Sequence, residues 1–230
     1  MVSSSLSRDA TFSLPSPKLR ESLGRAVERY EASVSLAATY LEGRGITADI
    51  AARWRLGVVA DPLPEHERQA GRLVIPYLTP SGVVDIKFRC LENHDCKALN
   101  HAKYDNLPGS SARLYGVENF DVDSPIIALV EGNPDTWVCT DIVGIPAVGV
   151  DGANKWRPWW GHCFDGYERV FVFQHGDDAG KKLSENAKAN IYNAEVVVKP
   201  LPSGEDINSF VLQHGVEAFL QRAGLLETPA

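Results

Sequence analysis

The chain has 230 residues, a formal net charge of −7 and four cysteines. No apolar run approaches the roughly 18–20 residues that cross a membrane, and the Ser- and Pro-rich N-terminus lacks the apolar segment of a signal peptide. The negative charge argues against a protein that coats polyanions, but a nucleic-acid enzyme stays open because local basic patches or bound cations can neutralise phosphates. Cysteines without a secretory signal indicate a reducing compartment, so we expect a cytoplasmic protein.

The first part of the chain predicts helices followed by a small antiparallel sheet. Apolar residues recur at helical spacing after a polar start, and two runs of β-forming residues flank the turn Thr79–Gly82. The predicted elements are a flexible tail (1–17), a helical region (18–41), a short helix (47–54), a short strand (56–60), a polar loop (62–69), a hairpin (73–78 and 83–91) and a long loop (93–111).

From residue 126 onward, apolar strand-like runs alternate with helix-like segments, which is typical of a mostly parallel sheet. The predicted strands are 126–131, 146–150, 169–173 and 194–199, and the predicted helices are 134–141, 179–193, 207–214 and 216–224, the last two separated by Gly215. We therefore expect an α/β fold: an N-terminal α+β subdomain (18–120), a doubly wound sheet (121–210) and a C-terminal helix (211–230).

Two of the predicted strands end in acidic residues. The apolar run that begins at residue 125 breaks into Glu131 and Asp135, and the run that begins at residue 170 breaks into Asp177 and Asp178. Ligands of doubly wound sheets bind beyond the carboxyl ends of the strands, so these acids are expected to meet at one crevice. Clustered carboxylates favour hard divalent cations, and we expect Mg²⁺ or Mn²⁺.

Three short motifs in the second half have a familiar pattern. They are EGNPD (131–135), HGDDAG (175–180) and GEDIN (204–208). Their order and spacing resemble the Toprim domain shared by DnaG-type primases, topoisomerases and some nucleases. That family has Glu-Gly after its first strand, Asp-x-Asp followed by Ala-Gly after a later strand, and a further acidic pair.

The resemblance extends upstream. The stretches YLEGRGI (40–46), GRLVIPY (71–77) and LYG (114–116) occur in the order of the signposts of the DnaG RNA-polymerase core, as do Arg89-x-Leu91 and Lys103-Tyr104. Residues 35–215 therefore resemble a DnaG-type primase core without the family's N-terminal zinc-ribbon domain, of the kind a phage or mobile element encodes.

This resemblance implies a function. A primase core joins NTPs into short RNA primers on a single-stranded DNA template, with Mg²⁺ or Mn²⁺ bound by the carboxylates. It would act in the bacterial host cytoplasm and has a replicative helicase as a further candidate partner. The implied catalytic residues are Glu131, Asp135 and Asp177, the implied metal ligands are Glu131, Asp177, Asp178 and Asp206, and the implied template or nucleotide contacts are Lys87, Arg89, Lys103 and Arg113.

Two residues depart from the family pattern. His175 stands where the first Asp of Asp-x-Asp is expected, and Asn208 stands where primases often have a last Asp. Imidazole suits softer metals than Mg²⁺, and Asn keeps an oxygen but loses a charge. Three interpretations stay open for a primase core: weaker metal binding or a preference for Mn²⁺, a disabled binding protein, and an engineered inactive protein. Two other functions are a non-catalytic module for single-stranded DNA or replisome binding, and a Toprim nuclease.

A second group of metal-ligand residue types lies in the polar loop after the predicted hairpin. Cys90, His94, Cys96 and His101 offer four sulfur and nitrogen ligands, the number that a structural zinc site needs. Their spacing is not that of a common zinc finger. The sequence leaves a zinc site and a loop with incidental thiols as alternatives.

Overall fold

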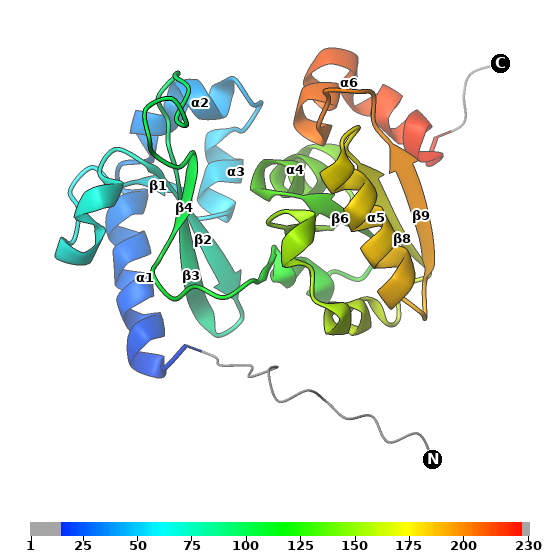
Figure 1. The fold of residues 1–230 in the computed structure, drawn as a ribbon, viewed down its shortest axis with the longest axis horizontal. Helices are drawn as coiled ribbons and strands as arrows, with labels where there is room; N and C mark the ends of the chain where they lie inside the picture. The colour runs from blue at the N-terminus through cyan, green and yellow to red at the C-terminus, as the bar shows by residue number, and fades with distance from the viewer. Residues whose placement is uncertain (1–14, 227–230) are drawn as a thin grey trace.

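A computed structural model describes residues 15–226. Figure 1 shows two lobes side by side: an N-terminal lobe (17–106) and a C-terminal lobe (114–226). Each lobe is built on its own sheet, of four and five strands respectively. The expected α/β fold is confirmed. Apart from residues 15–17, the expected tail lies outside the described residues, as do the last residues of the expected C-terminal helix.

The N-terminal lobe packs α1 against an antiparallel sheet of order β1-β2-β3-β4. Ser16 caps α1 by accepting a hydrogen bond from the Leu19 amide, and Thr47 caps α3 in the same way through the Ile50 amide. The elements are α1 (Pro17–Glu31), α2 (Ala38–Glu42), α3 (Ala48–Arg53), β1 (Gly57–Val58), β2 (Leu73–Thr79), β3 (Gly82–Arg89) and β4 (Tyr104–Asn106).

The predicted hairpin is confirmed, since β2 and β3 pair antiparallel and Thr79 lies opposite Gly82. The prediction of an unbroken loop over 93–111 was wrong, because β4 forms within it and pairs with β3. β4 is short, half-buried and polar, so it has no apolar alternation that a sequence could show. The segment 62–69, also expected to be a loop, contains the 3₁₀ helix Pro64–Gln69, which buries His66.

The C-terminal lobe has a sheet of order β5-β7-β6-β8-β9. The last four strands are parallel, and β5 pairs antiparallel with β7 at one edge. The mostly parallel sheet is thus confirmed, and through β5 it begins before residue 121. The strands are β5 (Leu114–Tyr115), β6 (Ile126–Glu131), β7 (Ala147–Val150), β8 (Arg169–Gln174) and β9 (Glu195–Pro200).

Helices cover both faces of this sheet (Figure 1). The helix α4 (Asn133–Trp137) continues as a π-helical segment, Val138–Val143, and α5 (Asp178–Asn190) joins β8 to β9. The last helix, α6 (Ile207–Ala223), is interrupted at Gly215, whose φ of 84° and ψ of 167° are accessible to glycine and costly for other residues. The predicted break between two helices at Gly215 is confirmed.

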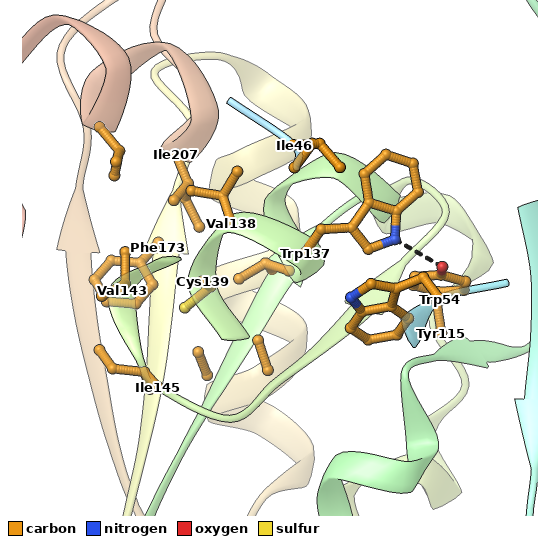
Figure 2. Packing of buried hydrophobic residues seen from close by; sticks show 14 of the residues in the cluster. Ile46, Trp54, Tyr115, Trp137, Val138, Cys139, Val143, Ile145, Phe173 and Ile207 are labelled. Carbon is orange, nitrogen blue, oxygen red and sulfur yellow. Dashed lines mark hydrogen bonds between the residues drawn. The ribbon is translucent and has the colours of Figure 1, made fainter. Parts of the chain in front are cut away.

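The two lobes share one apolar core (Figure 2). Trp54 of the N-terminal lobe stacks on Tyr115 of the C-terminal lobe, with ring centroids 5.2 Å apart, and the Trp137 indole donates a 2.7 Å hydrogen bond to the Tyr115 hydroxyl. At the edge of this contact the Trp54 indole donates to Asp141. Continuous burial of this kind sets the position of one lobe against the other, and so defines the space between them.

Candidate active site

A cavity of about 390 Å³ opens between the lobes, and we call it the crevice. β3 and β4 of the N-terminal lobe form one wall, and the carboxyl ends of β6, β7 and β8 form the other. Its charged lining residues are Glu131, Asp135, Asp151, Asp206, Arg44, Lys87, Lys103, Lys155 and His175. Acids and bases therefore face one another across a single space.

The sheet brings the predicted acids to this place. Glu131 is the last residue of β6, and His175 follows the end of the neighbouring parallel strand β8. The start of α5 holds the turn after β8 in position, because a Cβ on Gly180 would lie 2.4 Å from the His175 carbonyl oxygen. A larger residue at 180 would displace that turn, which explains why the motif needs glycine there.

His175 forms the centre of the acidic group. Its Nε2 lies 2.8 Å from Asp135 Oδ2, and its Nδ1 lies 3.9 Å from Glu131 Oε2. Burial lowers the pKa of His175, but the hydrogen bond to Asp135 and the charges of Asp135, Glu131 and Asp206 outweigh burial and raise the pKa to about 9. His175 is therefore an imidazolium at neutral pH, and it supplies a positive charge where the family pattern expects a carboxylate.

Both carboxylate oxygens of Asp135 contact other groups of the protein. Its side chain is 3 % exposed, one oxygen meets His175, and the other accepts a 3.2 Å hydrogen bond from the Asn208 amide. Burial raises the pKa of Asp135, and the contacts with His175 and the Asn208 amide oppose that rise. Asp135 therefore positions His175 and the start of α6.

Glu131 has one oxygen without a hydrogen-bond partner. Within residues 15–226 its buried Oε2 receives no hydrogen bond, and His175 Nδ1 at 3.9 Å is too distant to donate one. Burial raises the pKa of Glu131, His175 opposes this, and the charges of Asp177 and Asp135 raise it further. A buried carboxylate oxygen without a donor, next to other acids, is the arrangement that a bound cation would satisfy.

The remaining predicted ligands have different surroundings. Asp206 lines the crevice and caps α6, accepting a 2.7 Å hydrogen bond from the Ser209 amide. Burial raises the pKa of Asp206, but the bonds from Ser209 and the charges of Arg44 and His175 hold it below its usual value. Asp177 caps α5 through the Gly180 amide. Asp178 points to solvent, 3.7 Å from Lys181, and is not part of the crevice lining.

The Asn208 side chain is hydrogen-bonded to Arg44. It accepts a 3.0 Å hydrogen bond from Arg44 Nη1 through Oδ1 and donates a 2.7 Å bond to the Arg44 carbonyl oxygen. This pair joins the start of α6 to the turn after α2. The structure thus lines the crevice with Glu131, Asp135, His175 and Asp206, and leaves Asp177, Asp178 and Asn208 out of the lining.

The predicted basic contacts divide into two pairs. Lys87 and Lys103 line the crevice. Arg89 is buried, donates to the Cys90 carbonyl oxygen and stacks on Tyr40, with its guanidinium carbon 3.9 Å from the ring centroid. Arg113 lies 3.5 Å from Asp85 beside a neighbouring cavity.

Burial lowers the pKa of Lys87, although its 2.5 Å contact with Asp151 opposes the shift.

Three charged crevice residues, Arg44, Asp151 and Lys155, are missing from the residues predicted from sequence. A signal existed for two of them. Arg44 lies in the YLEGRGI stretch, and Asp151 directly follows the predicted strand 146–150, as His175 directly follows β8. Lys155 lies in a 3₁₀ turn of a Gly- and Trp-rich segment, where no pattern distinguishes it.

The four residues of the possible zinc site also come together, at a cavity separate from the acids. Their ligand atoms all lie within 4.8 Å of one another. We call Cys90, His94, Cys96 and His101 the Cys/His cluster.

Comparison with known proteins places the chain in a family. No protein-family model matches it. The gene 57 protein of Mycobacterium phage D29 is 34% identical over 157 residues, which cover 66% of this chain and 97% of the phage protein. The chain belongs to the same family as this phage protein. Within residues 15–226, no helix is long and apolar enough to span a membrane.

Solved structures show which fold this family member has. It resembles the RNA polymerase domain of Mycobacterium tuberculosis DnaG primase (TM-score 0.72, 19% identity, 91% of this chain and 84% of that one) and the E. coli primase catalytic core (0.66, 22%, 89% and 79%). A DnaG catalytic domain bound to single-stranded DNA is similar (0.70, 22%, 90% and 77%). The fold is that of the DnaG primase catalytic core, as the resemblance in sequence implied.

Proposed function

We propose that this chain is a primase-type RNA polymerase core that joins NTPs into short RNA on single-stranded DNA. The observation that carries the proposal is the partnerless carboxylate oxygen of Glu131, located at a strand end and facing basic residues across the crevice. The DnaG fold supports it, as does the DnaG domain whose structure holds single-stranded DNA. The chain as a whole, N-terminal lobe included, would form the polymerase.

The donor set fits a hard divalent cation at Glu131. Its oxygen lacks a hydrogen bond, and the Asp177 charge is near enough to raise its pKa, so a cation between them would relieve repulsion. Glu131 and Asp177 are the proposed ligands of Mg²⁺ or Mn²⁺, and Asp206, which also lines the crevice, is a further candidate. When bound, such a cation lowers the pKa of an attacking hydroxyl and neutralises phosphate charge. Asp178 points away and has no role in this proposal.

The basic residues of the crevice would hold the phosphates. Arg44, Lys103 and Lys155 line it, and none of them is a buried member of an ion pair, so their charges are available to a triphosphate or a template backbone. Lys87 has a different task, because it is buried between Asp151 and Asn133 and 4.4 Å from the Tyr104 ring centroid. We assign it to positioning Asp151 and Tyr104.

His175 sets the strength of the metal site. As an imidazolium it neutralises part of the charge of Asp135 and Glu131, so fewer free negative charges remain for a cation than in a site with aspartate there. We therefore propose a weaker metal affinity and better activity with Mn²⁺ than with Mg²⁺. The protein would work in the cytoplasm of a bacterial host, with a replicative helicase as a candidate partner.

The deciding experiment incubates the full chain with single-stranded DNA of mixed sequence, labelled NTPs and Mn²⁺. The proposal expects short RNA products that depend on the template and disappear with EDTA. His175→Asp is expected to raise the yield with Mg²⁺ by about tenfold, because it restores an oxygen ligand and removes a positive charge. No product from either protein on any template would refute the proposal.

One observation favours a second function, a non-catalytic module that binds single-stranded DNA. The His175–Asp135 ion pair stabilises the site without any metal. This function predicts DNA binding that is insensitive to EDTA and no RNA product from wild type or His175→Asp. Cleavage of a labelled strand without NTPs would instead identify a nuclease.

A further inference from the structure

We propose that the Cys/His cluster is a structural zinc site built into the polymerase fold itself. The four ligand atoms lie within 4.8 Å of one another, and Cys90 Sγ is 3.7 Å from His94 Nε2. Tetrahedral zinc with bonds of about 2.0–2.3 Å separates its ligand atoms by about 3.3–3.8 Å. The ligand atoms therefore lie around one point, and side-chain rotations that move the two histidine nitrogens apart from 2.7 Å would give the spacing that one zinc ion needs.

The two histidines present nitrogens to one another. His94 Nε2 and His101 Nε2 are 2.7 Å apart, with ring planes at 88°. His101 Nδ1 lies 3.2 Å from the Ala102 carbonyl oxygen and 3.3 Å from Arg72 Nη2. When Nδ1 donates to the Ala102 carbonyl, Nε2 is unprotonated and its lone pair faces the cluster. Histidine ligands of zinc are commonly oriented by such a second hydrogen bond.

The loop that carries the cluster is held by hydrogen bonds of its own and by Arg72, without a helix or strand. Residues 90–103 join β3 to β4 without a helix or strand, and Leu99 in their middle is 60% exposed. Cys90 and Cys96 are nevertheless buried, at 7% and 8% exposure. Loops of this length that are ordered without their own secondary structure commonly have a functional reason for it. A metal that binds residues from both ends of the loop would add a strong cross-link to these hydrogen bonds.

The ligand types select zinc over the cation proposed for the crevice. Two thiolates and two imidazoles are the donors of structural zinc sites, whereas Mg²⁺ and Ca²⁺ require oxygen ligands. Among residues 15–226, this is the group of cysteine, histidine and acidic side chains whose ligand atoms converge. The sulfur and nitrogen donors of this cluster therefore differ in chemistry from the oxygen donors proposed to bind a cation in the crevice.

The location indicates what the zinc does. The Cys90 amide donates a 2.9 Å hydrogen bond to the Lys103 carbonyl oxygen, and Lys103 lines both the crevice and the cavity of the Cys/His cluster. Tyr104, the next residue, begins β4 and also lines the crevice. Zinc would therefore hold the loop against the edge of the crevice and fix the position of Lys103.

The test measures zinc in the full chain purified under reducing conditions without chelator, from cells grown with added zinc. Elemental analysis is expected to find about one zinc per chain in wild type and in Cys163→Ser, an exposed thiol outside the cluster that serves as the control. Cys90→Ser combined with Cys96→Ser is expected to lose at least tenfold in zinc content. Cobalt-loaded protein should show the absorption bands of tetrahedral thiolate coordination.

His94→Gln keeps the test decisive if the double cysteine variant does not fold. His94 is exposed, so the substitution leaves the packing intact and is expected to weaken zinc binding by about 10–100-fold. Wild type that contains no zinc and takes up none while its cysteines are reduced would overturn the proposal, as would a Cys90–Cys96 disulfide in freshly purified protein. None of these measurements needs nucleotides or DNA, so zinc-loaded protein that makes no RNA would refute only the primase function.

Discussion

Two histidines of this protein lie in opposite surroundings. His175 in the crevice contacts Asp135 and Glu131, so it gains a proton and acts as a cation. His94 in the Cys/His cluster faces another imidazole nitrogen and a thiol sulfur. The same side chain thus holds a proton among carboxylates at one site and is a proposed metal ligand at the other. The neighbours decide which, because carboxylates stabilise the protonated form of imidazole.

The largest expected effect is at Glu131. Glu131→Gln keeps the shape of the side chain but removes its charge, so RNA synthesis should fall at least about 100-fold, a loss typical of removing one key electrostatic group. Primer assays with Mn²⁺ measure it, with circular dichroism to verify folding. Glu168→Gln, at an exposed position before β8, is the matched control and should retain activity. If Glu131→Gln were about as active as wild type, Glu131 would not be a catalytic residue.

The buried His175–Asp135 ion pair should contribute more to the free energy of unfolding than an exposed ion pair does. Asp135→Asn leaves His175 without its charged partner, and we expect the free energy of unfolding at about pH 6 to fall by about 3 kcal/mol. Urea denaturation measures this. The control is Asp165→Asn, since the Asp165–His162 pair has a similar 3.2 Å contact but both of its side chains are exposed, and water screens it. Equal losses in both variants would mean that the His175–Asp135 pair contributes nothing particular.

The pH dependence follows from the pKa of about 9 for His175. This value lies above the ordinary value of about 6.5, so the pair stabilises the folded state fully below about pH 6.5 and loses this contribution as the pH rises through about 9. The stability advantage of wild type over His175→Gln should therefore shrink by no more than about 3 kcal/mol between about pH 6 and pH 10. Denaturation curves of both proteins test it, and an advantage independent of pH would contradict the raised pKa.

The smallest expected effect links the two sites. Loss of zinc from the Cys/His cluster would loosen Lys103 without touching Glu131, so the KM for NTPs should rise about threefold while kcat stays unchanged. Steady-state assays of Cys90→Ser combined with Cys96→Ser, compared with Cys163→Ser, separate the two constants. A fall in kcat at constant KM would mean that the cluster acts on the reacting groups instead.

Local patterns in the sequence determined most of the architecture. The alternation of apolar strands and helices predicted the parallel sheet, the turn Thr79–Gly82 predicted the hairpin, and Gly215 predicted the break in α6. These features depend on periodicity, turn chemistry and glycine conformation, which neighbouring residues specify. Acids that directly follow buried strands likewise indicated where the crevice would lie.

Only the tertiary structure decided the partners of those residues. Asp135 contacts His175, and Arg44 donates to Asn208, although the members of each pair are far apart in the chain. Asp178, by contrast, is exposed to solvent. The sequence did not predict β4 for a related reason: this short polar strand depends on pairing with the edge of β3. Charge pairing and burial depend on three-dimensional distances, which no local pattern contains. The acids that the fold places around His175 raise its pKa, and burial leaves Glu131 Oε2 without a hydrogen-bond partner.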